Sequence, residues 1–154
     1  MHLAELNVGV LSHPKGSPEA AEFFDNLERV NGFAERMPGF VWRLKDEGGD
    51  ATNFRLPGTN GEVAVNHSVW ESAETLQAFV FRTVHAGFYR KRASWFTRMA
   101  TPHFVMWWVE EGYLPTLEEA RERLERLTRE GPSDQAFGWE ELPDAQALRA
   151  QRCG

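Results

Sequence analysis

Residues 103–109 read HFVMWWV, and this stretch decides how the chain must pack. It is dense in aromatic and β-branched side chains, as β-strands prefer. One face of such a strand would carry Val105, Trp107 and Val109, and the other would carry Phe104, Met106 and Trp108. A strand that is apolar on both faces is buried on both faces. Because one layer of helices covers only one face, the sequence predicts a second copy of the sheet on the other, in a symmetric homodimer.

Strands and helices alternate along the rest of the chain. Residue patterns predict strands over 2–11, 40–45, 63–70 and 103–109, and a short last strand over 136–141. Caps at Ser17, Ser72 and Thr116 predict helices that end near Arg36, Gly87 and Gly131, and a further helical stretch over 89–98. This order predicts an α+β fold with the helices on one face of the sheet. The domain is expected to span 1–142, with 143–154 as a flexible C-terminal tail.

Two finer predictions follow from side-chain spacing. Alternation in the second strand puts Phe40, Trp42 and Leu44 on one face. In the last helix, Thr116 and Glu119 form a capping box. The ion pairs expected along that helix are Glu119–Arg123, Glu122–Arg126 and Glu125–Arg129.

Composition limits the class of protein. The chain has 154 residues, 42% hydrophobic and 26% charged, which fits one soluble globular domain. Its longest strongly apolar run, residues 104–109, is too short to cross a membrane, and the N-terminus has no signal-peptide pattern, so a cytoplasmic location is expected. The single cysteine, Cys153, allows no internal disulfide and no cysteine-based metal site. A net charge of −6 argues against a nucleic-acid partner.

Several segments in a fixed order resemble an uncharacterised bacterial family, the domain of unknown function 3291 family. They are NHSVWES at 66–72, a following helix that ends at His85, WF at 95–96, WWV at 107–109 and PTLEEA at 115–120. Asn7, GFVWRL at 39–44 and GP at 131–132 fit as well, so the resemblance covers about residues 2–140. It implies a ferredoxin-like antiparallel sheet with helices on one face, forming a dimeric α+β barrel of the antibiotic biosynthesis monooxygenase-like superfamily. That superfamily hosts cofactor-free monooxygenases, haem enzymes, isomerases and proteins without known activity, so the resemblance implies a fold rather than one reaction.

His85 and Asn7 are the predicted catalytic residues. A histidine near a helix end can transfer protons close to neutral pH, although it can equally cap the helix carbonyls. Asn7 lies on the mixed face of the first strand, where its amide could hold a developing oxyanion or bind the backbone of a loop. His67 lies among valines and reads as a ligand contact or as a core histidine, whereas His103 at a strand start reads as structural. The histidine spacing predicts no metal site.

A polar and aromatic set is expected to bind the substrate. It comprises Trp42, Arg43, His67, Trp70, Tyr89, Arg92, Trp95 and Trp107. The indoles, with Trp108, would line a cavity for a flat apolar ligand, although any one of them could be core or interface. Segment 82–98 has five basic residues and no acid, which indicates an anionic ligand group or a solvated helix face.

Haem is kept as a second alternative. Members of the superfamily that degrade haem combine a strand Asn with a helix Trp and His. Aligned on Trp70-Glu71-Ser72, Asn7 matches, but Phe79 and Tyr89 stand where the Trp and the His fall. His85 or Tyr89 could still be an axial ligand.

The sequence therefore predicts a small enzyme that acts on a hydrophobic or aromatic molecule without a tightly bound cofactor. Its reaction would be monooxygenase-, isomerase- or cyclase-like. The alternative is a non-catalytic module that binds a small ligand or dimerises.

Overall fold

The computed structural model describes residues 1–14, 16–45, 63–83, 87, 90–97, 99 and 101–142. Its strands are β1 (His2–Leu11), β2 (Phe40–Arg43), β3 (Val63–Trp70), β4 (Phe96–Thr97) and β5 (Phe104–Val109). Its helices are α1 (Pro18–Ala34), α3 (Ala73–Arg82), α5 (Arg92–Trp95), α6 (Leu117–Glu130) and a 3-10 helix (Trp139–Glu141). The predicted hairpin loop, the C-terminal tail, His85 and Tyr89 lie outside the described residues.

The strands form one antiparallel sheet in which β1 is central. The order is β2-β3-β1-β4, and β5 pairs with β1 on the same side as β4. Long pairings fix the register, with Leu3 opposite Trp70 on β3 and opposite Trp108 on β5. With α1 between β1 and β2 and α3 after β3, this is a ferredoxin-like arrangement, and the predicted ferredoxin-like α+β antiparallel fold is confirmed.

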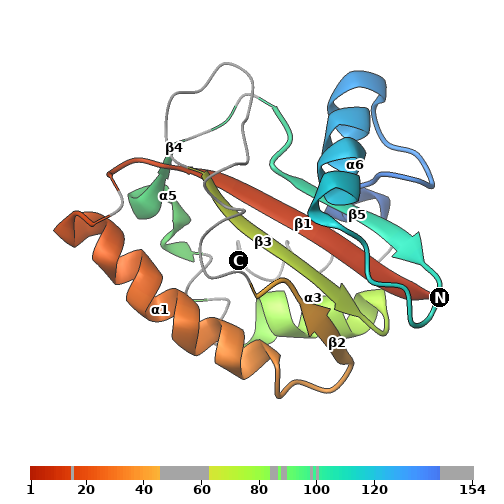
Figure 1. The fold of residues 1–154 in the computed structure, drawn as a ribbon, viewed down its shortest axis with the longest axis horizontal. Coiled ribbons are helices and arrows are strands. Elements are labelled where there is room, and N and C mark those ends of the chain that lie inside the picture. The colour runs from red at the N-terminus through yellow and green to blue at the C-terminus, as the bar shows by residue number, and fades with distance from the viewer. Residues whose placement is uncertain are drawn as a thin grey trace.

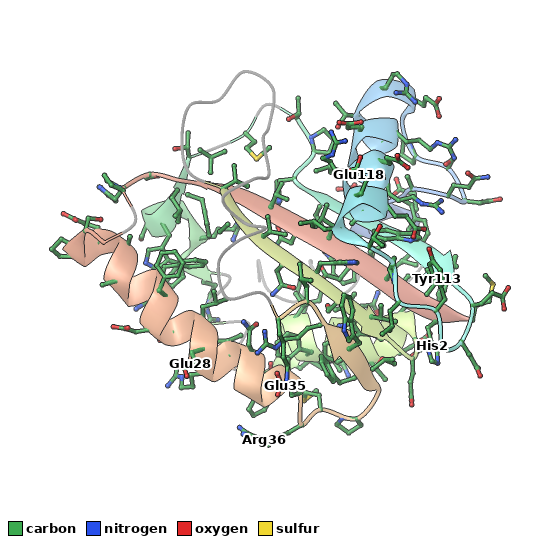
Figure 2. All side chains as sticks on the ribbon, viewed as in Figure 1. His2, Glu28, Glu35, Arg36, Tyr113 and Glu118 are labelled. Atoms are coloured by element: carbon green, nitrogen blue, oxygen red, sulfur yellow. The ribbon has the colours of Figure 1, made fainter. Side chains whose placement is uncertain are left out.

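Helices α1 and α3 cover one face of the sheet (Figure 1). Val30 and Ala34 of α1 and Phe79 of α3 pack with Leu3 and Trp70 of the sheet. The opposite side of α1 is polar, and Figure 2 shows Glu28 on it and Arg36 just after the end of the helix. This amphipathic pattern is what holds α1 against the sheet.

Helix α6 packs against the opposite face of the sheet (Figure 1). Its Ala120, Leu124 and Leu127 are buried with Leu6 of β1 and Trp107 of β5. The prediction that the helices lie on one face of the sheet is therefore wrong, because α6 of the chain itself covers part of the face that was expected to contact a second copy. The homodimer stays a prediction.

Two predicted elements take a different form. The helical stretch expected over 89–98 ends at Trp95, because Phe96-Thr97 extends to pair with Val10 and Leu11 of β1. The expected last strand is an isolated bridge between Phe137 and Met106, followed by the 3-10 helix.

Strand β2 does not alternate regularly. The pairing with β3 shifts between Phe40 and Trp42. Phe40 consequently packs edge-on against Trp70 on the α3 side, whereas Trp42 packs against the core below α6. The prediction that these two side chains share a face is wrong, because a bulge inserts a residue that period-two counting cannot see.

The α6 surface forms a different set of ion pairs from the one expected. Glu119–Arg123 is present at 3.2 Å, but Arg126 pairs with Glu130 at 3.6 Å. The side chain of Thr116 caps the helix by accepting from the Glu119 N–H at 3.1 Å. The Glu119 carboxylate accepts from the Tyr113 hydroxyl instead of completing a capping box. Among the described residues, no helix is long and apolar enough to span a membrane.

Gly9→Ala is expected to destabilise the fold. A Cβ at Gly9 would lie 2.6 Å from a ring carbon of Phe96, and that ring is itself held edge-on by Phe23. Overpacking of this kind costs about 1–3 kcal/mol. Gly32→Ala is the control, since Gly32 lies inside α1 and an added Cβ would have no atom of the described residues within 4 Å, the adjacent helix backbone aside. It should raise the free energy of unfolding by roughly 0.5–1 kcal/mol. Urea unfolding of both variants measures whether the free energy of unfolding falls for Gly9→Ala and rises for Gly32→Ala. The same change in both variants would contradict the steric argument.

Candidate functional site

Polar side chains lie on the α1/α3 side of the two central strands. Cross-strand pairing sets Glu5 opposite Ser68 and Asn7 opposite Asn66. Alternation turns all of them to the face that carries Leu3 and Trp70, away from the α6 core. We name the set the polar strip; its members are Glu5, Asn7, Asn31, Asn66, Ser68 and His103.

His103 joins the strip from the start of β5. Its backbone carbonyl accepts from the Val8 N–H at 2.9 Å, which extends the β1–β5 pairing. Its Nδ1 lies 3.5 Å from Asn7 Oδ1, at the outer limit of a hydrogen bond. Because an amide oxygen only accepts, Nδ1 carries the hydrogen and Nε2 is left with a lone pair. This arrangement suits a general base.

His103 is exposed at the surface, yet partial burial of its ring lowers its pKa below the usual 6.5. The charge of Arg92 lowers this pKa further, against a smaller opposing backbone hydrogen bond. The ring is therefore neutral near pH 7. A neutral imidazole can accept a proton at Nε2, so the charge state and the hydrogen-bond geometry favour the same role.

The amides of the strip are polarised by their own hydrogen bonds. Asn66 Nδ2 donates to Asn31 Oδ1 at 3.5 Å, so the helix α1 side chain presents its oxygen to β3. The Oδ1 of Asn7 faces His103. Within the described residues, these bonds leave the amide nitrogens of Asn7 and Asn31 to donate elsewhere. Two such N–H groups suit the oxygen of a carbonyl or an enolate.

Glu5 forms the buried end of the strip. It is 4% exposed, and its Oε1 accepts from the Ser68 hydroxyl at 2.5 Å. Trp70 Nε1 donates to the same hydroxyl oxygen at 3.0 Å. Burial raises the pKa of Glu5 to about 8, and the hydrogen bonds from Ser68 oppose this only in part. Glu5 is thus a neutral carboxylic acid at pH 7.

Aromatic clusters lie on both sides of the strip. At one end Trp70 stacks on Phe79 with ring centroids 5.2 Å apart. At the other end Phe23 packs against Trp95 at 5.6 Å. Helix α1 spans both, with Val30 in the first cluster and Phe23 in the second. All four rings are buried, so these clusters are packed core on either side of the polar strip.

Of the two predicted catalytic residues, Asn7 and His85, the structure describes only Asn7. Asn7 lies in the strip, whereas His85 lies outside the described residues, as does Tyr89. The histidine that does approach Asn7 is His103, which sequence reasoning treated as structural. His103 and Asn7 are far apart in the sequence, so the contact cannot be recognised from local pattern. The pairing of β5 with β1 brings the two residues together. Glu5 and Ser68 were also missed, although period-two spacing already placed Glu5 on the face of Asn7.

The tryptophans do not gather around one chamber. Trp42 and Trp107 belong to the core below α6. Trp70 packs with α3, Trp95 packs with Phe23 near α5, and Trp108 is exposed. Alternation along each strand sends neighbouring indoles to opposite faces, so the set is divided among three clusters.

His67 is buried on the α6 side of the sheet, where its ring contacts two backbone carbonyl groups. Its Nδ1 lies 2.8 Å from the Glu5 carbonyl oxygen, and its Nε2 lies 3.0 Å from that of Pro115. Its ring stacks near Trp107 and meets Trp42 edge-on. These contacts tie β3 to β1 and to the segment before α6, on the face away from the polar strip.

The two candidate arginines lie apart. Arg43 donates from Nε to the Glu35 carboxylate at 2.7 Å, which joins β2 to the end of α1. Arg92 is exposed at the start of α5, close enough to His103 for its charge to act on that ring. Among the described residues, no cluster of three or more His, Cys, Asp or Glu side chains could hold a metal ion.

Comparisons with solved structures find similar folds at low identity. SnoaB, a cofactor-independent oxygenase from Streptomyces nogalater, is 16% identical over 75% of this chain and 98% of its own, with a TM-score of 0.48. A DABB family protein with a ferredoxin-like fold from Mesorhizobium loti is 14% identical over 73% and 100%, with a TM-score of 0.45. A monooxygenase from the gene ActVA-Orf6 of Streptomyces coelicolor, in complex with nanaomycin D, is 17% identical over 75% and 92%, with a TM-score of 0.45.

No curated protein matches the sequence. A family match, by contrast, covers residues 2–153, nearly the whole chain. The chain belongs to the family described as Domain of unknown function (DUF3291).

Proposed function

We propose that this protein is an enzyme that removes a proton next to the carbonyl group of a small, hydrophobic, ring-bearing molecule, without a tightly bound cofactor. The observation that carries the proposal is the His103–Asn7 pair on the polar strip. Isomerisation, ring closure and addition of dioxygen can all start from the carbanion that such a step forms. The monooxygenase-, isomerase- and cyclase-like reactions considered from the sequence therefore share this first step.

His103 is the base in this proposal. Its Nε2 takes the proton from the substrate carbon, and the ring becomes an imidazolium whose Nδ1–H stays directed at Asn7. The lowered pKa of His103 keeps the resting ring neutral and ready to accept. General-base catalysis by a positioned histidine contributes roughly 10²–10⁴-fold in rate.

The strip amides stabilise the negative charge that forms on the substrate oxygen. In the described part of the chain, the hydrogen bonds of Asn7 and Asn31 use their amide oxygens, so each amide nitrogen is available for this role. Loss of one oxyanion donor costs about 10²–10³-fold in rate in enzymes that use one.

His103→Gln is expected to slow proton abstraction at least about 100-fold, because glutamine keeps polarity but cannot accept a proton at Nε2. The measurement is exchange of the α-hydrogens of 2-tetralone, a flat cyclic ketone, in deuterated buffer, followed by proton NMR with the buffer rate subtracted. His13→Gln is the control, since His13 is exposed at the far end of β1. Asn7→Ala should also slow the exchange.

An unchanged exchange rate in His103→Gln would remove the base from this proposal. If the wild-type protein binds 2-tetralone and exchanges nothing above the buffer rate, the non-catalytic binding module is favoured instead. A further readout is the pH profile: exchange should fall with decreasing pH, with its midpoint below 6.5, because protonated His103 cannot act as a base.

A further inference from the structure

We propose that Glu5 is the proton donor opposite His103, so that the reaction is a proton shift from one carbon of the substrate to another. This inference rests on the proposed function and names its reaction class as isomerisation. The substrate class is then a β,γ-unsaturated ketone, which becomes the conjugated α,β-unsaturated ketone. Glu5 has no part in the base step described above, and its burial needs an explanation.

The first argument is position. Glu5 and Asn7 are two residues apart on one face of β1, which separates their backbones by about 7 Å. Each faces a polar residue on β3, Ser68 and Asn66 respectively. The acid therefore lies on the same face of β1 as Asn7, the residue that His103 contacts.

The second argument is how the carboxyl group is held. Trp70 Nε1 can only donate, and it donates to the Ser68 oxygen. The Ser68 hydroxyl in turn donates to Glu5 Oε1. With Oε1 acting as acceptor, the acid proton belongs on Oε2. This chain of hydrogen bonds fixes the orientation of the carboxyl group.

The third argument is the opposite effect of environment on the two groups. Burial raises the pKa of Glu5, while burial and Arg92 lower that of His103. Near pH 7 the carboxyl is protonated and the imidazole is neutral. Two titratable groups whose pKa values are shifted in opposite directions in this way can supply the acid and the base of a reaction.

The proton shift balances without any co-reactant. His103 Nε2 takes a proton from the α-carbon, and the electron pair moves through the carbonyl to give a dienolate. Glu5 Oε2–H then gives its proton to the γ-carbon, and the electrons return from oxygen to form the conjugated ketone. Imidazolium and carboxylate remain. A buried carboxylate is unfavourable, so a proton passes back from His103 to Glu5, through water, as the product leaves.

The test measures two rates on one probe, 3-cyclohexen-1-one in deuterated buffer. NMR follows exchange at the α-carbon, and absorbance follows formation of the conjugated 2-cyclohexen-1-one. Glu5→Gln should lower the ratio of isomerisation to exchange at least tenfold, because glutamine fills the same space but has no acid proton. Ser68→Ala, which removes the orienting hydroxyl, should lower the ratio less. In the wild-type protein the ratio should fall as pH rises through about 8, and Glu5→Gln should show no such fall.

The outcomes separate this inference from the function on which it rests. If the wild-type protein exchanges the α-hydrogens but Glu5→Gln keeps the wild-type ratio and pH profile, Glu5 is not the donor, and the base step stands. Exchange without any isomerisation by the wild-type protein overturns the inference in the same way. If the wild-type protein does neither, with this probe or with 2-tetralone, the proposed function fails and this inference fails with it.

Discussion

Glu5→Gln is expected to abolish a loss of stability that the wild-type protein shows between about pH 4.5 and 8. In the folded chain the Glu5 carboxyl holds its proton up to a pKa of about 8, whereas in the unfolded chain it ionises near 4.5. Between these values unfolding releases a proton, so rising pH favours the unfolded state. The stabilisation is complete below pH 4.5 and disappears as pH rises through 8.

The size of this effect is large for a single side chain. Each pKa unit corresponds to about 1.4 kcal/mol, so the free energy of unfolding should fall by on the order of 5 kcal/mol across the window. Glutamine resembles the neutral acid and cannot ionise. The variant should therefore be close to the wild type at acidic pH and much more stable at pH 8.

Urea unfolding at a series of pH values from 4.5 to 8 measures this difference. Glu28→Gln is the matched control, because Glu28 lies exposed on the outer side of α1 (Figure 2). It should leave the slope of stability against pH as in the wild type. A Glu5→Gln variant with the wild-type slope would show that Glu5 does not hold a proton in the folded chain.

Gly39→Ala is expected to lower the free energy of unfolding by roughly 3 kcal/mol or more, through backbone strain and a steric clash. Gly39 has φ +85°, a conformation that residues with a Cβ rarely adopt. An added Cβ would also lie 2.3 Å from Cγ2 of Thr75. Thr75 cannot easily move away, because its hydroxyl and N–H form the capping box of α3 with Ser72. The carbonyl of Gly39 further accepts from the Glu71 N–H at 2.7 Å.

Gly112→Ala separates the two causes. Gly112 has nearly the same φ, +84°, but among the described residues, its chain neighbours aside, no atom lies within 4 Å of an added Cβ. This control should show the backbone strain alone, about 1–2 kcal/mol. Urea unfolding of both variants gives the comparison. If they lose the same stability, the contact with Thr75 contributes nothing and the steric part of the prediction is wrong.

Local patterns in the sequence were sufficient for most of the elements. Period-two alternation located β1 and β3, and the caps at Ser17, Ser72 and Thr116 located the starts of α1, α3 and α6. These features depend on neighbouring residues, so they can be recognised without the fold. The β2 bulge and the β4 pairing depend on distant strands, and local pattern gave no sign of them.

By itself, the sequence determined the fold class, the family and the position of Asn7 on the mixed face of the first strand. Only the tertiary structure decided which histidine contacts Asn7, which face of the sheet α6 covers and how the tryptophans are distributed among the hydrophobic clusters. The reason is that strand register and helix packing join residues far apart in the chain. His103 meets Asn7 because β5 pairs with β1, and Glu5 stays protonated because distant side chains exclude water from it.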